Sequence, residues 1–169
     1  MKKITETHVH VAVRNWLKRS GWKLIAGQYP GGSDDECSAL NIVDPALAKD
    51  KSPDPRRHSD NKLVPDIVAL SGRNLLLIEM KPNYSKADQE KLEYLVGERS
   101  FDLVLALKKF ALDKGCKDLE PIETLVFNIG LGFSKKSTYQ RDRHITYFLF
   151  EDLETVEVHF SDHLIRGVE

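Results

Sequence analysis

Two strongly apolar runs near the centre of the chain constrain the fold most, because a carboxylate interrupts each of them. Asp66 lies within Val64–Leu70, Glu79 lies within Leu75–Lys81, and a turn-forming segment at 71–74 separates the two runs. Short apolar runs bounded by turn residues are typical of strands that are covered on both faces. The pattern therefore predicts a β-hairpin in the middle of a sheet.

The register of this hairpin brings the two carboxylates together. A tight turn between Gly72 and Arg73 pairs residue numbers that add up to 145, which sets Asp66 directly opposite Glu79. Side chains at opposed positions have Cβ atoms about 5 Å apart on one face of the sheet. Lys81, two residues beyond Glu79, points to the same face. We therefore expect all three side chains to form one cluster.

Such a cluster favours a metal ion, because two carboxylates at this distance repel each other and a divalent cation removes the repulsion. Mg²⁺ takes one or two carboxylates and leaves its other positions to water and substrate phosphate. We expect Asp66, Glu79 and the backbone carbonyl of Met80 to be the ligands. Lys81 can then orient or help deprotonate an attacking water. A buried ion triad, or a strand end facing solvent, is the purely structural alternative.

The remaining pattern predicts a single α/β domain. Helical periodicity covers residues 6–19 and 85–97, and a helical turn covers 108–114; strands are predicted at 22–26, 101–107, 122–129, 144–150 and 155–160. Residues 27–63 hold several prolines and glycines and predict a long polar loop, either functional or disordered, with a short helix near Pro45–Ala48 as an option. This order of elements is typical of a mixed sheet covered by helices.

The central residues also carry a resemblance. Pro65-Asp66, twelve intervening residues and Glu79-Met80-Lys81 resemble the PD-(D/E)XK nuclease superfamily, and the similarity extends over about residues 6–107. The resemblance implies a restriction-endonuclease-like αβββαβ core with a mixed central sheet flanked by helices, here followed by C-terminal strands over 122–160. It also implies cleavage of phosphodiester bonds with Mg²⁺ or Mn²⁺.

The same resemblance assigns roles to residues. Asp66 and Glu79 match the metal ligands, and Lys81 matches the lysine that assists the nucleophile. Many members place a further glutamate on the first helix near the metal. Glu6 is the only acid on the predicted helix 6–19 and is the candidate ligand. An acid that stabilises the start of the helix is the alternative interpretation of Glu6.

Nucleic acid needs a local basic face, since the net charge of the chain is −1. The predicted connection 130–143 supplies four basic residues and an aromatic ring that can stack on a base: Lys135, Lys136, Arg141, Arg143 and Tyr139. Arg56 and Arg57 are a second, weaker candidate. A solvated charged loop is the alternative. Lys86 and Lys91 fit either substrate contacts or ordinary surface lysines.

These features together predict a metal-dependent DNA endonuclease, such as a restriction or other defence nuclease. The alternatives are a non-catalytic nucleic-acid- or partner-binding module of the same fold, and an RNA- or junction-specific nuclease. A homodimer or a companion subunit is expected by analogy only. No run approaches the roughly 18 apolar residues of a membrane span, and no apolar stretch follows Lys2 and Lys3. We therefore expect a cytoplasmic protein without membrane contact.

Overall fold

The computed structural model describes residues 3–28, 37–42 and 63–167. These residues form an α/β fold built on a mixed sheet, as predicted, and the sheet has six strands. The helices are α1 (Glu6–Arg19), α4 (Lys86–Val96), α5 (Ser100–Lys114) and α6 (Asp162–Gly167). The strands are β1 (Lys23–Gly27), β2 (Ile67–Ser71), β3 (Asn74–Met80), β4 (Val126–Ser134), β5 (Ile145–Asp152) and β6 (Thr155–His159).

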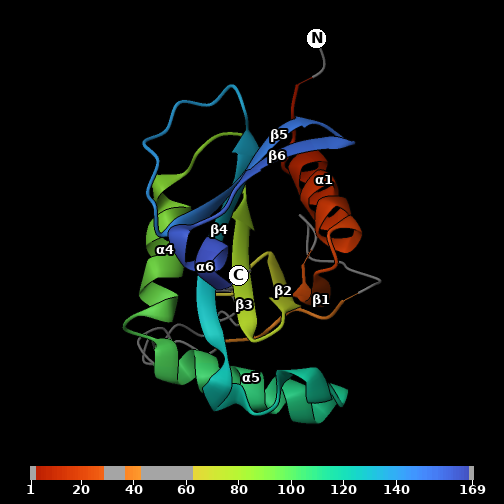
Figure 1. Ribbon diagram of the computed structural model, residues 1–169, viewed down its shortest axis with the longest axis vertical. Coiled ribbons are helices and arrows are strands. Elements are labelled where there is room, and N and C mark those ends of the chain that lie inside the picture. Colours follow the sequence, from red (N-terminus) through yellow and green to blue (C-terminus); the bar gives the residue numbers. More distant parts are fainter. Residues whose placement is uncertain (1–2, 29–36, 43–62, 168–169) are drawn as a thin grey trace, which may run out of the picture.

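The strands lie side by side in chain order, from β1 to β6. The first three form an antiparallel meander, β3, β4 and β5 run parallel, and β6 is antiparallel to β5. A crossover through α4 and α5 joins β3 to β4 (Figure 1). The loop that enters α4 and the helix α5 lie at opposite ends of the sheet.

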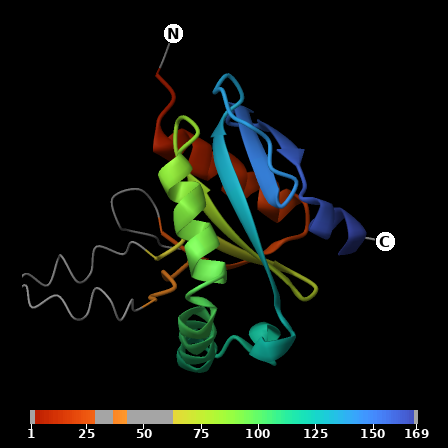
Figure 2. The ribbon, with the colours of Figure 1, turned by 90° about the vertical axis from the view of Figure 1, so that its left-hand side faces the viewer.

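Helices cover both faces of the sheet (Figures 1 and 2). On one face, α1 packs against the alternate residues Leu76 and Ile78 of β3. On the other face, α4 and α5 pack against Leu75 and Leu77. Central strands buried on both faces explain why the sequence of β3 is apolar at nearly every position. Glu79 has the same parity as Leu75 and Leu77, and therefore points toward α4.

The start of α1 is fixed by a reciprocal pair of hydrogen bonds. The Thr5 hydroxyl accepts from the backbone N–H of His8 at 3.2 Å, and His8 Nδ1 accepts from the N–H of Thr5 at 3.1 Å. After the helix, Gly21 has a φ of 83°, the left-handed conformation that ends many helices. The predicted helix 6–19 is confirmed. Its first residue, Glu6, lies at the helix end nearest the site.

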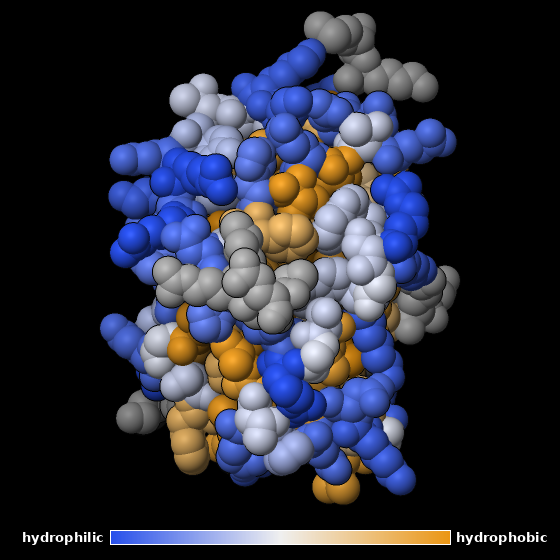
Figure 3. Space-filling view, in the orientation of Figure 1, coloured by the Kyte–Doolittle hydropathy of each residue, from blue (hydrophilic) through white to orange (hydrophobic). Residues whose placement is uncertain are grey.

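The strand predicted at residues 101–107 is wrong, because this segment and the turn predicted at 108–114 form the single helix α5. Buried side chains recur at helical spacing, at Leu103, Leu107, Phe110 and Ala111. Phe101 is 71% exposed, whereas a strand would bury it together with Leu103. Apolar residues also occur on the outer side of α5, so the helical periodicity could not be recognised in the sequence. Hydrophobic surface is visible at the lower end of the molecule (Figure 3). No helix in the described residues is long and apolar enough to cross a membrane.

Two loop predictions also need correction. The polar connection predicted at 130–143 begins later, because β4 continues to Ser134, and the strand predicted from Ile122 starts only at Val126 after two short 3-10 helices, Lys117–Leu119 and Ile122–Thr124. Within the predicted loop 27–63, Leu40 and Ile42 are buried in the core that also contains the inner face of α5. The optional helix near Pro45–Ala48 lies outside the described residues. The short helix α6 was not predicted.

Gly132 allows β4 to pack closely beneath α1. A Cβ atom at this position would lie 2.9 Å from Met80 Cγ and 3.3 Å from methyl groups of Val9 and Val13. The two valines are stiff at χ1, and Met80 is fully buried. We predict that Gly132→Ala lowers the free energy of unfolding by about 1–3 kcal/mol, as measured by urea denaturation. Ser71→Ala, at the exposed end of β2, serves as control, and equal stability of the two variants would contradict this packing.

Candidate active site

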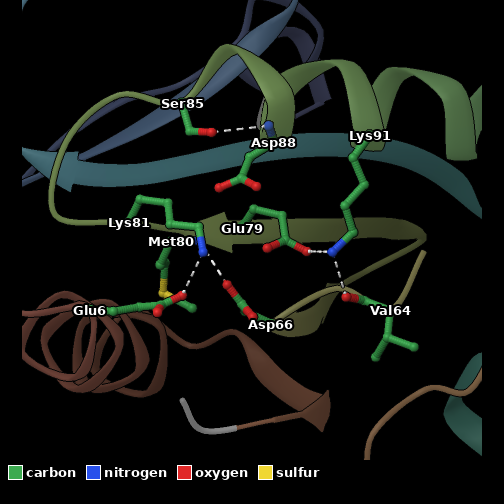
Figure 4. Close-up of polar contacts among 9 residues, drawn as sticks. All are labelled: Glu6, Val64, Asp66, Glu79, Met80, Lys81, Ser85, Asp88 and Lys91. Carbon is green, nitrogen blue, oxygen red and sulfur yellow. Dashed lines mark hydrogen bonds and ion pairs between the residues drawn. The ribbon is translucent and has the colours of Figure 1, made fainter. Parts of the chain in front are cut away.

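The β2–β3 hairpin has the predicted register. Ile67 pairs with Ile78 and Ser71 pairs with Asn74, so that paired residue numbers add up to 145. Asp66 directly precedes β2, at the position that continues this register opposite Glu79. Its carboxylate Oδ2 accepts a hydrogen bond from the backbone N–H of Met80 at 2.9 Å. Asp66 is therefore held against the end of β3, as Figure 4 shows.

Glu79 lies at the buried end of β3, with only 4% of its side chain exposed. Its carboxylate Oε1 lies 2.5 Å from Nζ of Lys91, a residue of α4. The same ammonium group donates to the backbone carbonyl of Val64 at 2.9 Å. Lys91 therefore bridges Glu79 and the segment that leads into β2. A buried carboxylate without such a partner would be very costly.

The carboxyl groups of Asp66 and Glu79 interact directly. Burial raises the pKa of Glu79 well above its ordinary value, and repulsion by the Asp66 carboxylate raises that pKa further. The ammonium group of Lys91 acts in the opposite direction. The proximity of Asp66 thus favours the protonated form of Glu79. Without a cation, Glu79 therefore holds a proton more readily than an ordinary glutamate.

Lys81 contacts the first helix. Its Nζ lies 3.3 Å from Oε1 of Glu6, and both side chains are partly exposed, 44% for Lys81 and 31% for Glu6. Partial burial alone would lower the pKa of Lys81, but the carboxylates of Glu6, Asp88 and Asp66 together raise that pKa. Lys81 is therefore a charged donor. This state suits the stabilisation of negative charge on a phosphate better than the removal of a proton from water.

Asp88 and Lys91 of α4 are the residues that sequence analysis missed or left open. Asp88 faces both lysines of the site (Figure 4); burial raises its pKa, while Lys81 and Lys91 act to lower it. The Ser85 hydroxyl accepts from the N–H of Asp88, which fixes the start of α4. A signal was present, since Asp88 and Lys91 share a helix face with the buried Leu92 and Leu95. Lys86 is an exposed lysine paired with Glu90.

The charge of this cluster suits a divalent cation. Four carboxyl groups interact here with two ammonium groups: Glu6, Asp66, Glu79 and Asp88 with Lys81 and Lys91. If all are ionised, two negative charges are in excess. In the described part of the chain, no group of three or more His, Cys, Asp and Glu side chains is arranged to hold an ion alone. Two carboxylates, completed by backbone and water oxygens, still match what Mg²⁺ commonly takes from a protein.

The residues predicted to contact nucleic acid differ in how accessible they are in the structure. Lys135 is occupied by Glu151 at 2.5 Å and Glu157 at 3.6 Å. Tyr139 packs against Phe133 and Tyr147, with ring centroids 4.9 Å and 4.8 Å apart, so its ring belongs to the core edge. The other three basic residues of the connection are exposed: Lys136, Arg141 and Arg143. Arg56 and Arg57 lie outside the described residues.

Comparison with known proteins adds no relative. The sequence matches no family model, and no curated protein or solved structure is significantly similar to it. The chemistry of the site therefore has to be inferred from its own geometry.

The raised pKa of Glu79 has a consequence for stability without metal. Below about pH 4 Glu79 is protonated in both states, but at higher pH the unfolded chain loses this proton while the native state retains it. Stability of the metal-free protein should therefore fall as pH rises. We predict that Glu79→Gln gains more than about 1 kcal/mol relative to wild type between pH 4 and pH 8, measured by urea denaturation in EDTA.

Glu93→Gln, which removes an exposed carboxylate from the same helix α4, is the matched control for that experiment. If wild type and Glu79→Gln show parallel pH profiles, Glu79 does not hold its proton in the native state.

Proposed function

We propose that this protein is a metal-dependent phosphodiester hydrolase, an endonuclease acting on DNA. The observation that carries the proposal is the convergence of Asp66 and Glu79 from neighbouring strands, with Lys81 two residues further along β3. Burying two carboxylates at the same strand end costs folding free energy unless a cation is bound between them. A lysine beside them supplies the positive charge that a phosphate group requires.

The order of elements supports the same class. Helix α1, strands β1 to β3, helix α4 and strand β4 follow the order implied by the resemblance to PD-(D/E)XK nucleases, with α5 inserted before β4. The strand that the resemblance implies after the helix was first expected at residues 101–107. We assign it instead to β4, which pairs in parallel with β3. The strands β5 and β6 extend this sheet. A restriction-endonuclease-like core remains a proposal that rests on this order.

Asp66 and Glu79 would hold Mg²⁺ or Mn²⁺, together with the backbone carbonyl of Met80. When bound, the ion would supply Lewis acidity and a more acidic water. Lys91 contacts Glu79 at 2.5 Å. When no ion is bound, its ammonium group is therefore the counter-charge of the Glu79 carboxylate. With all four carboxyl groups ionised, Lys81 and Lys91 together would leave two negative charges, which a divalent cation would neutralise.

Lys81 would contact the scissile phosphate. Its ammonium group donates hydrogen bonds to phosphate oxygens, offsets their developing charge and orients the water that attacks. Glu6, predicted as a metal ligand by resemblance, instead contacts Lys81 at 3.3 Å. This contact favours a positioning role for Glu6, since its carboxylate fixes the free end of a long and partly exposed side chain.

The cluster of Asp66, Glu79 and Lys81 also argues against a binding module of the same fold, which would have no need of a buried carboxylate pair. An RNA- or junction-specific nuclease would use the same chemistry on another substrate. Lys136, Arg141 and Arg143 remain the candidate nucleic-acid contacts, and two-fold association or a companion subunit remains an expectation by analogy.

The chemistry can be tested by plasmid cleavage. We predict metal-dependent cutting with Mg²⁺, no cutting in EDTA, and a rate at least about 10²-fold lower for Asp66→Ala and for Lys81→Met. Lys109→Met is the matched control, because Lys109 is an exposed lysine of α5 that lies outside the site. If plasmid, single-stranded DNA and RNA all remain intact with Mg²⁺ and with Mn²⁺, the protein is not an independent nuclease.

Metal binding can be measured without any substrate. A ligand that binds only the folded state raises the free energy of unfolding by about 2.7 kcal/mol at a concentration 100-fold above its Kd. We predict such stabilisation of the wild type by Mg²⁺ or Mn²⁺ in thermal unfolding. Asp66→Asn should lose it, whereas Asp113→Asn, an exposed acid at the end of α5, should keep it. Equal stabilisation of all three proteins would place the ion elsewhere.

A further inference from the structure

A second basic feature lies beside the candidate active site. A cavity of about 610 Å³ opens between the start of α4 and the connection from β4 to β5. Its walls include Tyr84, Lys86 and Gln89 on the helix side and Arg141, Asp142 and Arg143 on the other. We call it the Arg141–Arg143 cavity. Three cations face it against one acid, and hydrophilic side chains dominate this part of the surface (Figure 3).

The turn that carries the two arginines is fixed from below. The N–H of Asp142 donates to Tyr147 Oη at 2.9 Å, and Asp142 Oδ1 accepts from the N–H of His144 at 2.8 Å. The acid between the arginines therefore serves the turn itself. Arg141 and Arg143 are exposed, and in the part of the chain that the structure describes neither forms an ion pair. Lys135, on the same connection, differs because two glutamates occupy it.

The cavity and the active site belong to one rigid frame. The N–H of Lys81 donates to the Gly132 carbonyl at 3.0 Å, and the N–H of Ser134 donates to the Pro82 carbonyl at 3.0 Å. Tyr84, in the cavity wall, donates its N–H to Ser137 Oγ at 2.9 Å. The segment from Lys81 to Tyr84 is thus bound along its length to β4 and the residues that follow.

One nucleic-acid strand can reach both features. Tyr84 is three residues from Lys81, so their Cα atoms are at most about 11 Å apart. Successive phosphates of a duplex strand lie at least about 3.4 Å apart, because that is the rise per phosphate along the helix axis. A strand whose scissile phosphate contacts Lys81 would therefore bring one of its next few phosphates to the wall of the Arg141–Arg143 cavity at Tyr84.

We propose that the Arg141–Arg143 cavity is a subsite for a backbone phosphate of the nucleic-acid strand, next to the bond that is cut. Guanidinium groups bind phosphate oxygens in a bidentate manner, and the cavity has room for a phosphate and its sugar. This inference rests on the proposed function. It gives the protein a means to hold a strand in a fixed position beside Lys81 without contacts to the bases.

The salt dependence of binding tests this subsite, because each phosphate contact contributes about 0.9 to the slope of log K against log salt concentration. A fluorescein-labelled DNA duplex would be titrated with the full chain in buffer that contains Ca²⁺. Fluorescence anisotropy would give the binding constant at several salt concentrations between 50 and 300 mM. The variant Arg141→Gln/Arg143→Gln should reduce the slope by about 2 and weaken binding at least about tenfold at 100 mM salt.

Lys109→Gln/Lys114→Gln is the matched control, since it removes two exposed cations from α5 and should leave slope and affinity unchanged. Circular dichroism and thermal unfolding of each variant confirm that it is folded. If the duplex binds the wild type and the arginine variant keeps the wild-type slope, the subsite is refuted.

The remaining outcomes separate this inference from the proposed function. Arginine-dependent binding without cleavage in Mg²⁺ or Mn²⁺ would support the subsite and contradict the nuclease. Cleavage by the wild type, with a salt slope that the arginine variant leaves unchanged, would support the nuclease and contradict the subsite. Failure of the wild type to bind any duplex or single strand would also overturn the subsite. Inorganic phosphate provides the last arm. If it binds in an arginine-dependent manner while the variant binds DNA normally, the cavity accepts free anions and not a strand.

Discussion

The buried carboxylate of Glu79 is the constraint on which the rest of the site depends. A strand covered on both faces leaves a charged group at its end little access to water, and the native structure compensates for this only in part. Asp66 lies opposite on the neighbouring strand, Lys91 approaches from α4 at 2.5 Å, and the Val64 carbonyl fixes the lysine. Lys91 lowers the cost of the negative charge, but Asp66 raises it. The carboxyl groups of the site can therefore still supply negative charge to a bound cation.

The two lysines of the site have different places and therefore different tasks. Lys91 is largely buried and bound to Glu79, whereas Lys81 is partly exposed and bound to Glu6. A group that meets an incoming phosphate must be accessible, which favours Lys81. The backbone beyond Lys81 is bonded to β4 and to the connection that carries Arg141 and Arg143. Catalytic chemistry and strand positioning would thus share one frame.

Local patterns predicted the hairpin and its site because they depend on few variables. A tight turn at Gly72 and Arg73 and the alternation of a strand are enough to place Asp66, Glu79 and Lys81 together. Asp88 and Lys91 could not be placed in this way, because the rotation of α4 about its axis is set by how Leu92 and Leu95 pack on the sheet. The helix α5 was taken for a strand because exposed apolar residues such as Leu112 masked its periodicity. In each case tertiary packing decides what the local sequence leaves open.

Anomalous diffraction from crystals grown with Mn²⁺ would test most directly whether Asp66 and Glu79 share one cation. The expected result is a single peak within about 2.0–2.3 Å of a carboxylate oxygen from each residue, the range for hard cations bound by oxygen ligands. Lys91 should then no longer be the counter-charge of Glu79. The contradictory result would be no peak at this position at saturating Mn²⁺, with Lys91 still in contact with Glu79. The cluster would then be an ion network that serves the fold alone.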